Sequence, residues 1–211
     1  MGAVGGVERT ADQAARESRR GDDVGDEADR VRLFGAQATG GYGMLVTARS
    51  RTGAAGETPG ETDDRGVVGY ATSADLQTWQ VQAPLSEPGA GFAHLEVLQY
   101  VDIDGVTHAI FSCDAAALAG ERGRASNARG GIWSVRVKGP GVPIDAGDAS
   151  LLVDERLYAG RAVRGRDGEW YLLGFNNVTV DGGFGGRLSD PIALTVRDGR
   201  LALAELEVPA R

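Results

Sequence analysis

The stretch Gly69-Tyr-Ala-Thr-Ser-Ala-Asp-Leu-Gln-Thr-Trp79 decides the fold class of this 211-residue chain. Small, aromatic and β-branched residues lead into a Ser-x-Asp turn, and an aromatic residue follows four positions later. Asp75 is expected to end a strand in an Asx-type turn, because its carboxylate accepts hydrogen bonds from the backbone just ahead of it. Trp79 is then expected to pack beneath that turn as the next strand begins. The stretch therefore predicts a strand, a tight turn and a second strand.

The residues on both sides of this stretch have the same character. The Asp-Gly pairs at 104–105, 167–168 and 198–199 predict hairpin turns. The 33 glycines fit a chain with many tight turns, and we find no amphipathic helix pattern in the body of the chain. The sequence therefore predicts an all-β protein. Its predicted strands are 44–49, 66–72, 95–103, 108–113, 131–137, 157–163, 170–175 and 192–196.

A weak internal repeat indicates how these strands are grouped. Asp104-Gly105 and Asp167-Gly168 lie 63 residues apart, and each pair is followed by a strand. Gly41 lies 64 residues before Gly105 and also precedes a predicted strand. A period of this kind built from short strands favours a β-propeller, in which each repeat is one four-stranded blade. A β-sandwich with accidental spacing is the alternative.

Residues 1–30 differ from the rest of the chain. They contain eight acidic residues and five arginines but no Leu, Ile, Phe, Tyr or Trp. Such a segment buries too little apolar area to offset the entropy lost on ordering. The sequence therefore predicts a disordered or weakly helical tail over 1–30 and one domain over 31–211. An acidic docking arm is the alternative role for the tail.

Composition excludes several classes of protein. The net charge of −8, without a dense Lys or Arg cluster, argues against a nucleic-acid surface. No apolar run approaches the length of a membrane span. The single cysteine, Cys113, allows no intrachain disulfide, and the first residues lack a secretory signal, so a cytoplasmic location is expected. Cys113 lies in an apolar run typical of a buried strand, and a catalytic thiol is the alternative. His94, His108 and Cys113 have no zinc-binding spacing, and no metal or other cofactor is expected.

Three stretches together resemble a known family. They are Gly69 to Trp79, His94-Leu-Glu-Val-Leu-Gln99 and Asp154-Glu-Arg-Leu-Tyr-Ala159, and the later stretch Gly182-Gly-Phe-Gly-Gly-Arg-Leu-Ser-Asp-Pro191 fits a closing blade. Their order and spacing resemble the β-fructosidases of glycoside hydrolase families 32 and 68, with the family 43 enzymes as neighbours. The resemblance implies a five-bladed β-propeller, of which this chain holds the strands of about three blades. It also implies a carbohydrate ligand such as sucrose or a fructan.

The resemblance also implies a retaining two-carboxylate mechanism, in which one carboxyl protonates the leaving oxygen and the other attacks the anomeric carbon. Glu96 takes the position of the acid/base, and His94 and Tyr158 those of substrate-binding residues. In a regular strand, His94, Glu96 and Leu98 share one face. A carboxyl group there suits a general acid, whereas an exposed glutamate on an edge strand is the alternative.

The second carboxylate of that mechanism is missing from the expected place. The chain has no Asn before Asn127 and no Pro before Pro59, so neither an Asn-Asp-Pro nor an Arg-Asp-Pro motif precedes the first strand. Val97 also replaces the cysteine of the family's Glu-Cys motif. Asp114 and Asp190 are possible substitutes, although both are more typical of strand ends. We therefore expect an N-terminally truncated chain without the nucleophile. A non-catalytic carbohydrate-binding or vestigial propeller fragment is the alternative, and a protein-interaction propeller is a third.

Overall fold

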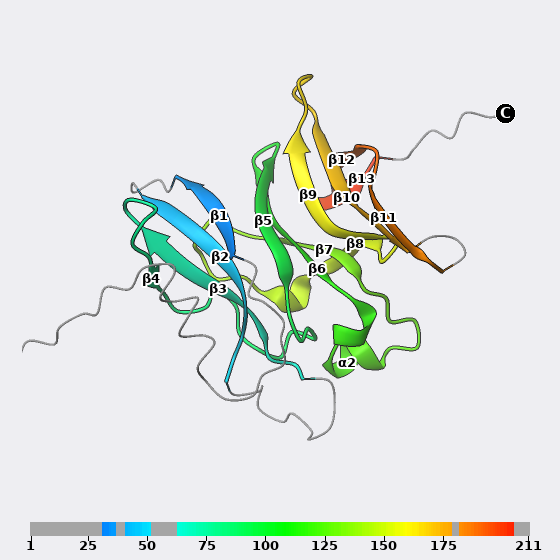
Figure 1. Cartoon of the computed structure of the whole chain (residues 1–211), viewed down its shortest axis with the longest axis horizontal. Coiled ribbons are helices and arrows are strands. Elements are labelled where there is room, and N and C mark those ends of the chain that lie inside the picture. The colour runs from blue at the N-terminus through cyan, green and yellow to red at the C-terminus, as the bar shows by residue number, and fades with distance from the viewer. Residues whose placement is uncertain (1–30, 37–40, 52–62, 179–181, 205–211) are drawn as a thin grey trace, which may run out of the picture.

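The computed structural model describes residues 31–36, 41–51, 63–178 and 182–204. These residues form three antiparallel sheets, each built from consecutive strands, which confirms the propeller-type fold with about three blades (Figure 1). The predicted tail over residues 1–30 lies outside the described residues, so the boundary at residue 30 stays a prediction.

Blade 1 is a four-stranded sheet in the order β1-β2-β3-β4. Its turn after β3 forms as the sequence predicts: Oδ1 of Asp75 accepts hydrogen bonds from the backbone N–H groups of Gln77 and Thr78, both at 2.8 Å. Trp79 is buried beneath this turn and donates to the carbonyl of Leu76 at 3.3 Å. The strands are β1 (Val31–Ala36), β2 (Tyr42–Arg49), β3 (Gly66–Ser73) and β4 (Gln80–Val81).

Blade 2 is a four-stranded sheet in the order β5-β6-β7-β8. The strands are β5 (Glu96–Ile103), β6 (Val106–Cys113), β7 (Gly131–Arg136) and β8 (Ser150–Asp154). Between β6 and β7 lie a 3-10 turn, η2 (Ala115–Ala117), and a five-residue helix, α2 (Gly120–Arg124). A second 3-10 turn, η3 (Ala146–Asp148), precedes β8. The sequence analysis did not predict α2, because one turn with two glycines and no buried residue carries no amphipathic pattern.

Blade 3 has five strands, because two short strands pair with different halves of β10. Strand β11 pairs with the C-terminal half of β10, and β12 pairs with the N-terminal half of β10. Strand β9 pairs along the other edge of β10, and β13 pairs with β12. The strands are β9 (Leu157–Arg164), β10 (Trp170–Val178), β11 (Phe184–Leu188), β12 (Ile192–Arg197) and β13 (Arg200–Leu203).

The repeat seen in the sequence marks the same turn in every blade. Gly41, Gly105 and Gly168 all lie between the first and second strands of their blades, and all have positive φ (94°, 75° and 90°). The first strands of adjacent blades contact one another, since β5 contacts both β1 and β9 (Figure 1). Other strands reach the next blade's first strand as well: β2 contacts β5, and β6 and β7 contact β9. The innermost strand of blade 2 is therefore β5 (Glu96–Ile103).

The three blades enclose two apolar cores, so blade 2 is buried on both faces. Phe111 and Ala109 point into the core shared with blade 1, together with Leu45 and Val68. Ile110 points the other way, into the core shared with Leu172 and Leu194 of blade 3. This explains why the segment ending at Cys113 reads as one continuous apolar run rather than an alternating one. Cys113 itself is fully buried, as predicted.

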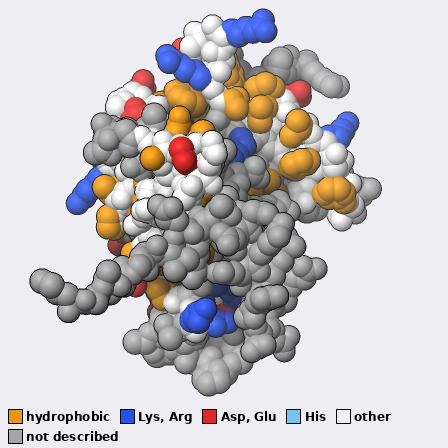
Figure 2. All heavy atoms as spheres, turned by 60° about the vertical axis from the view of Figure 1, so that its left-hand side comes forward, with side chains coloured by type: hydrophobic (Ala, Val, Ile, Leu, Met, Phe, Trp, Pro, Cys, Tyr) orange, Lys and Arg blue, Asp and Glu red, His pale blue; other side chains and the backbone are white. Residues whose placement is uncertain are grey.

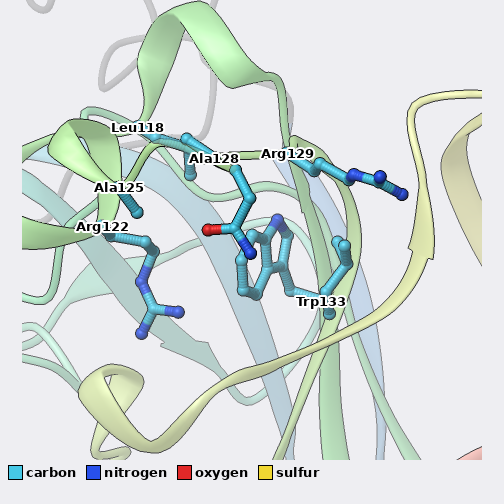
Figure 3. Close-up of a pocket in the computed structure, with 8 residues that line it drawn as sticks. Leu118, Arg122, Ala125, Ala128, Arg129 and Trp133 are labelled. Carbon is cyan, nitrogen blue, oxygen red and sulfur yellow. The ribbon is translucent and has the colours of Figure 1, made fainter.

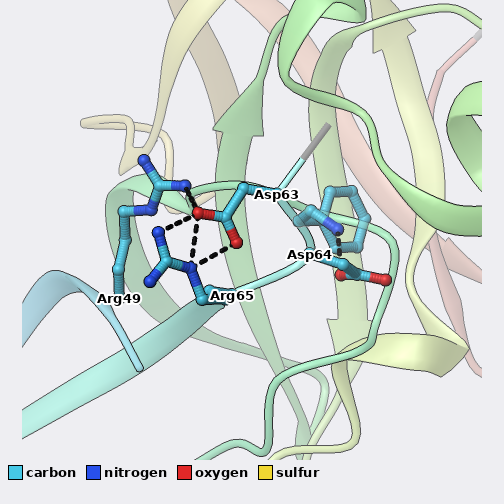
Figure 4. Close-up of polar contacts among 5 residues, drawn as sticks. Arg49, Asp63, Asp64 and Arg65 are labelled. Atoms are coloured by element: carbon cyan, nitrogen blue, oxygen red, sulfur yellow. Dashed lines mark hydrogen bonds and ion pairs between the residues drawn. The ribbon is translucent and has the colours of Figure 1, made fainter. Parts of the chain in front are cut away.

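Asp63 joins two arginines of blade 1, and Asp64 binds the linker that leads into β5 (Figure 4). The Asp63 carboxylate pairs with Arg49 at the end of β2, at 2.5 Å, and with Arg65. Oδ1 of Asp64 accepts hydrogen bonds from the backbone N–H groups of Gly91 and Phe92 at 2.8 and 3.1 Å. This linker therefore delivers the chain to the start of β5 in a fixed position.

Exposed apolar side chains lie on β10 and β11 of blade 3. Phe175 and Leu188 are directly opposite each other in the β10–β11 register, and they are 44% and 65% exposed. Phe184, near the other end of β11, is 77% exposed. Hydrophobic side chains also gather over the upper part of the surface in Figure 2, with Lys and Arg side chains at its edges. Exposed apolar patches of this kind mark contact surfaces.

Candidate active site

Glu96 is the first residue of β5, and its half-buried side chain meets Tyr158 of blade 3. The Tyr158 hydroxyl donates a hydrogen bond to Oε2 of Glu96 at 2.8 Å. Because Tyr158 lies near the start of β9, the two residues occupy matching places on the inner strands of adjacent blades. The structure thus brings together two of the three site residues that the sequence predicted.

A break in each strand aims these two side chains. Val97 and Ala159, the residues that follow Glu96 and Tyr158, both have a φ of 53°, and the strand register shifts at both places. β-bulges re-aim side chains and are common next to active sites. A β-branched residue at positive φ is an outlier, and such strain costs on the order of 1–3 kcal/mol. The rest of the fold therefore holds Val97, the residue that follows Glu96, in an otherwise unfavourable backbone geometry.

The bulge also changes which side chains of β5 share a face, compared with the prediction for a regular strand. His94, Glu96 and Leu98 were expected to share a face, but Leu98 points into the core between blades 1 and 2, together with Leu95. Glu96 instead pairs in register with Ser112 and meets Tyr158 on the side of blade 3. The prediction was wrong because one extra residue in a strand reverses the facing of every residue after it.

Further polar contacts lock β5 against β9 just below the pair. The Gln99 side-chain amide donates to the carbonyl of Ala162 at 2.8 Å and accepts from its N–H at 2.9 Å. Nη1 of Arg161 donates to the carbonyl of Leu98 at 3.1 Å. These bonds fix the spacing of the two inner strands, and so the distance between Glu96 and Tyr158.

The environment of Tyr158 keeps its hydroxyl protonated. Burial raises the pKa of Tyr158 well above its usual value, and the charge of Glu96 and the hydrogen bond to it raise this pKa further. The hydroxyl therefore keeps its proton and serves as a hydrogen-bond donor to the Glu96 carboxyl group.

Ser112 is a residue of this site that the sequence analysis missed. It lies directly opposite Glu96 in the β5–β6 register and is completely buried. Its Oγ has no hydrogen-bond partner among the described residues. Buried polar atoms without partners are rare in folded proteins and occur at functional sites. Nothing in the sequence singles out this serine within its apolar run.

His94 and Cys113 lie behind the pair. His94 is only 7% exposed, so its predicted role in substrate binding stays a prediction. Burial raises the pKa of the Cys113 thiol, and the charges of Asp114, Glu96 and Glu155 raise it further, while a hydrogen bond from the backbone of His94 opposes them. A thiol held protonated in this way is a poor nucleophile, which favours the buried structural role predicted for Cys113.

Two further carboxylates lie near Cys113, and each accepts a backbone hydrogen bond through one of its oxygens. Oδ1 of Asp114 accepts from the N–H of Ala117 at 2.8 Å and caps η2. Oε1 of Glu155 accepts from the N–H of Ala115 at 2.5 Å. Asp190, the other substitute named from the sequence, lies between β11 and β12 and precedes Pro191. Asp114 and Asp190 thus both lie at strand ends, as predicted.

A separate cavity of about 390 Å³ lies under the segment that joins β6 to β7 (Figure 3). Trp133 of β7, Arg122 of α2 and Leu151 of β8 are among its walls, whereas Glu96 is not. Within the described ranges, no group of three or more His, Cys, Asp or Glu side chains is arranged to hold a metal ion. None of the helices in those ranges has the length and apolar character needed to cross a membrane.

Comparison with solved structures identifies the fold. The chain is similar to inulosucrase from Halalkalicoccus jeotgali bound to kestose, with a TM-score of 0.61 and 19% identity, covering 89% of this chain and 52% of that one. A levansucrase from B. megaterium gives a TM-score of 0.61 at 13% identity, covering 96% and 54%. The GH32 beta-fructofuranosidase from Bombyx mori gives 0.57 at 18% identity, covering 85% and 37%.

These likenesses establish a fold of the GH32 and GH68 type. The chain spans about half the length, or less, of these solved structures. No protein-family model and no curated protein matches the sequence.

Proposed function

We propose that this chain is the acid/base half of a fructosyl-processing glycoside hydrolase, with Glu96 as the general acid/base of a retaining reaction. The observation that carries this proposal is the pairing of Glu96 with Tyr158 at two matching bulges on adjacent inner strands. The fold likeness to inulosucrase, levansucrase and beta-fructofuranosidase supports the substrate class, a fructoside such as sucrose or a fructan.

Each of the three predicted site residues has a defined role in the proposed chemistry. Glu96 donates its proton to the glycosidic oxygen as the bond to the anomeric carbon breaks, and later removes a proton from the attacking water. Tyr158 orients the carboxyl group and contacts substrate beside it. His94, which lies two residues before the start of β5, is proposed to line the substrate site.

The second carboxylate of the mechanism, the nucleophile, is not assigned to any residue of this chain. Asp114 and Glu155 already accept backbone hydrogen bonds, and no Asn-Asp-Pro or Arg-Asp-Pro motif occurs before the first strand. We therefore propose that the chain by itself does not supply the nucleophile. The alternative is a non-catalytic carbohydrate-binding or vestigial propeller fragment, which would cleave no fructoside even with an added nucleophile. A cytoplasmic location, suggested by the single cysteine, is part of the proposal.

An added nucleophile tests the assignment of Glu96. Azide can attack the anomeric carbon in place of the missing carboxylate, while Glu96 protonates the departing oxygen, and the product is a fructosyl azide. We expect azide-dependent cleavage of sucrose by the wild-type chain and a loss of about 10²–10⁴-fold in Glu96→Gln, which keeps the shape but removes the proton donor. Glu155→Gln is the matched control and should retain cleavage. Equal rates in all three proteins, or none in any, would contradict the proposal.

A further inference from the structure

The cavity beside Trp133 has the size and the walls of a ligand site. Its volume of about 390 Å³ falls in the range of small-molecule pockets. Figure 3 shows the Trp133 indole and the Arg122 side chain on one side of the space, with the chain from Leu118 to Arg129 arched over it. Leu118, Ala125 and Leu151 provide apolar walls.

Two hydrogen-bond donors at this cavity are not fully used. Trp133 is 5% exposed, and its indole Nε1 has no acceptor among the described residues. The Arg122 guanidinium uses three N–H groups on backbone carbonyls, those of Ala90, Ala149 and Gly147, and it has five. A buried indole N–H without an acceptor carries a desolvation cost that a bound oxygen atom would remove.

The donors are held rigidly. The centre of the Arg122 guanidinium lies 4.6 Å from the Phe92 ring centroid and 4.8 Å from that of Trp133. The two rings also pack edge to face, with centroids 5.2 Å apart. A preorganised site loses less entropy when a ligand binds.

Two arginines, Arg122 and Arg129, line the cavity, and each has a carboxylate nearby, which favours a neutral ligand over an acid. Nη1 of Arg129 lies 3.8 Å from Oδ2 of Asp154. The negative charge of Asp64 acts on Arg122 and raises its pKa, against the larger lowering caused by burial. The cation therefore already has a nearby counter-charge. Asn127, on the cavity wall, offers both a donor and an acceptor, as a sugar hydroxyl requires.

We infer that this cavity is an accessory binding site for a single neutral sugar unit. The choice of a fructosyl sugar rests on the proposed function, but the site does not belong to the proposed catalytic centre. Trp133 points into the core between blades 1 and 2, while Glu96 faces blade 3. Two strand spacings, roughly 10 Å, separate their strands within blade 2.

The indole N–H signals of the three tryptophans report on this site directly. The chain is labelled with nitrogen-15 and titrated with methyl β-fructofuranoside, with sucrose and, separately, with glucuronate. We expect the Trp133 signal, identified by its loss in Trp133→Phe, to shift saturably with a neutral sugar. The Trp79 signal should stay in place, because that N–H already bonds to Leu76.

The second readout is the affinity of variants of the chain for the sugar, measured on the signals of the sugar itself. Trp133→Phe keeps an aromatic ring but removes the N–H, and should weaken binding roughly two- to tenfold, the contribution of one hydrogen bond. Asn127→Ala, at an exposed position, tests the site without touching the core. Trp170→Phe, the same exchange in blade 3, is the matched control and should bind normally.

The outcomes separate this inference from the proposed function. Sugar binding that survives Glu96→Gln but weakens in Trp133→Phe and Asn127→Ala supports the accessory site, whatever the azide experiment gives. A Trp133 shift with glucuronate alone overturns the neutral-sugar assignment. No Trp133 shift with any of the three probes, or binding lost only in Glu96→Gln, overturns the site itself.

Discussion

Val97 and Ala159 share the same left-handed backbone conformation, and each follows one member of a hydrogen-bonded pair, Glu96 and Tyr158, whose positions differ by 62 residues. The candidate site is therefore formed by equivalent positions of two successive repeats. Two adjacent blades bulge at the same place on their inner strands, and the bulges turn a carboxyl group and a phenol toward each other.

The strain at these bulges is measurable. Ala159→Gly should leave the free energy of unfolding unchanged or raise it by up to about 1 kcal/mol, because glycine adopts positive φ without a steric penalty. Ala162→Gly, in the regular part of the same strand and buried, should lower it by about 1 kcal/mol. Urea unfolding measures both, and equal losses in the two variants would show that Ala159 is not strained.

Ser112 and Ser86 should respond in opposite directions to the same substitution. Ser112→Ala removes a buried hydroxyl without a partner and should stabilise the chain by about 1 kcal/mol. Ser86 is also buried, but its Oγ accepts from the N–H of Val68 at 2.9 Å. Ser86→Ala should therefore cost about 1–3 kcal/mol. Thermal or urea unfolding decides the matter, and destabilisation by Ser112→Ala would indicate that its hydroxyl has a partner in solution.

Stability should fall in alkaline solution. Burial raises the pKa of Tyr100 to about 12, and that of Tyr158 is raised as well. The unfolded chain releases these protons near pH 10, while the folded chain keeps them, so the unfolded state is favoured as pH rises. The stabilisation is complete below about pH 10 and is lost toward the folded pKa. Melting temperatures measured across this range should decline less steeply in Tyr158→Phe, and an identical slope would argue against its burial.

The exposed apolar side chains of β10 and β11 should make the isolated chain associate. Phe175, Leu188 and Phe184 are all exposed, whereas the apolar side chains between blades 1 and 2 and between blades 2 and 3 are buried. Phe184→Glu combined with Leu188→Glu should shift the chain toward monomer in sedimentation experiments. Val81→Glu, at an equally exposed position on blade 1, should not. A wild-type chain that stays monomeric at high concentration would contradict this prediction.

The sequence predicted the parts of the fold that local chemistry determines. The Asp75 turn and the Asp104-Gly105 and Asp198-Gly199 turns form where expected, because these residues favour the required backbone angles. The bulges were not predictable, since neither Val97 nor Ala159 is a residue that marks positive φ. The pairing of Glu96 with Ser112, and the Arg122–Trp133 contact, depend on strand register and on packing between distant segments. Neither of these contacts can be predicted from a local sequence pattern.

The central claim is that Glu96 is a proton donor to a leaving group, and the dependence of cleavage on that group tests it most directly. Azide-dependent cleavage of sucrose, whose leaving group needs a proton, is compared with that of p-nitrophenyl β-fructofuranoside, whose acidic phenol departs without one. Glu96→Gln should lose about 10²–10⁴-fold on sucrose and retain most of its rate on the nitrophenyl substrate. Equal losses on the two substrates, or no loss on sucrose, would contradict the assignment of Glu96 as the general acid.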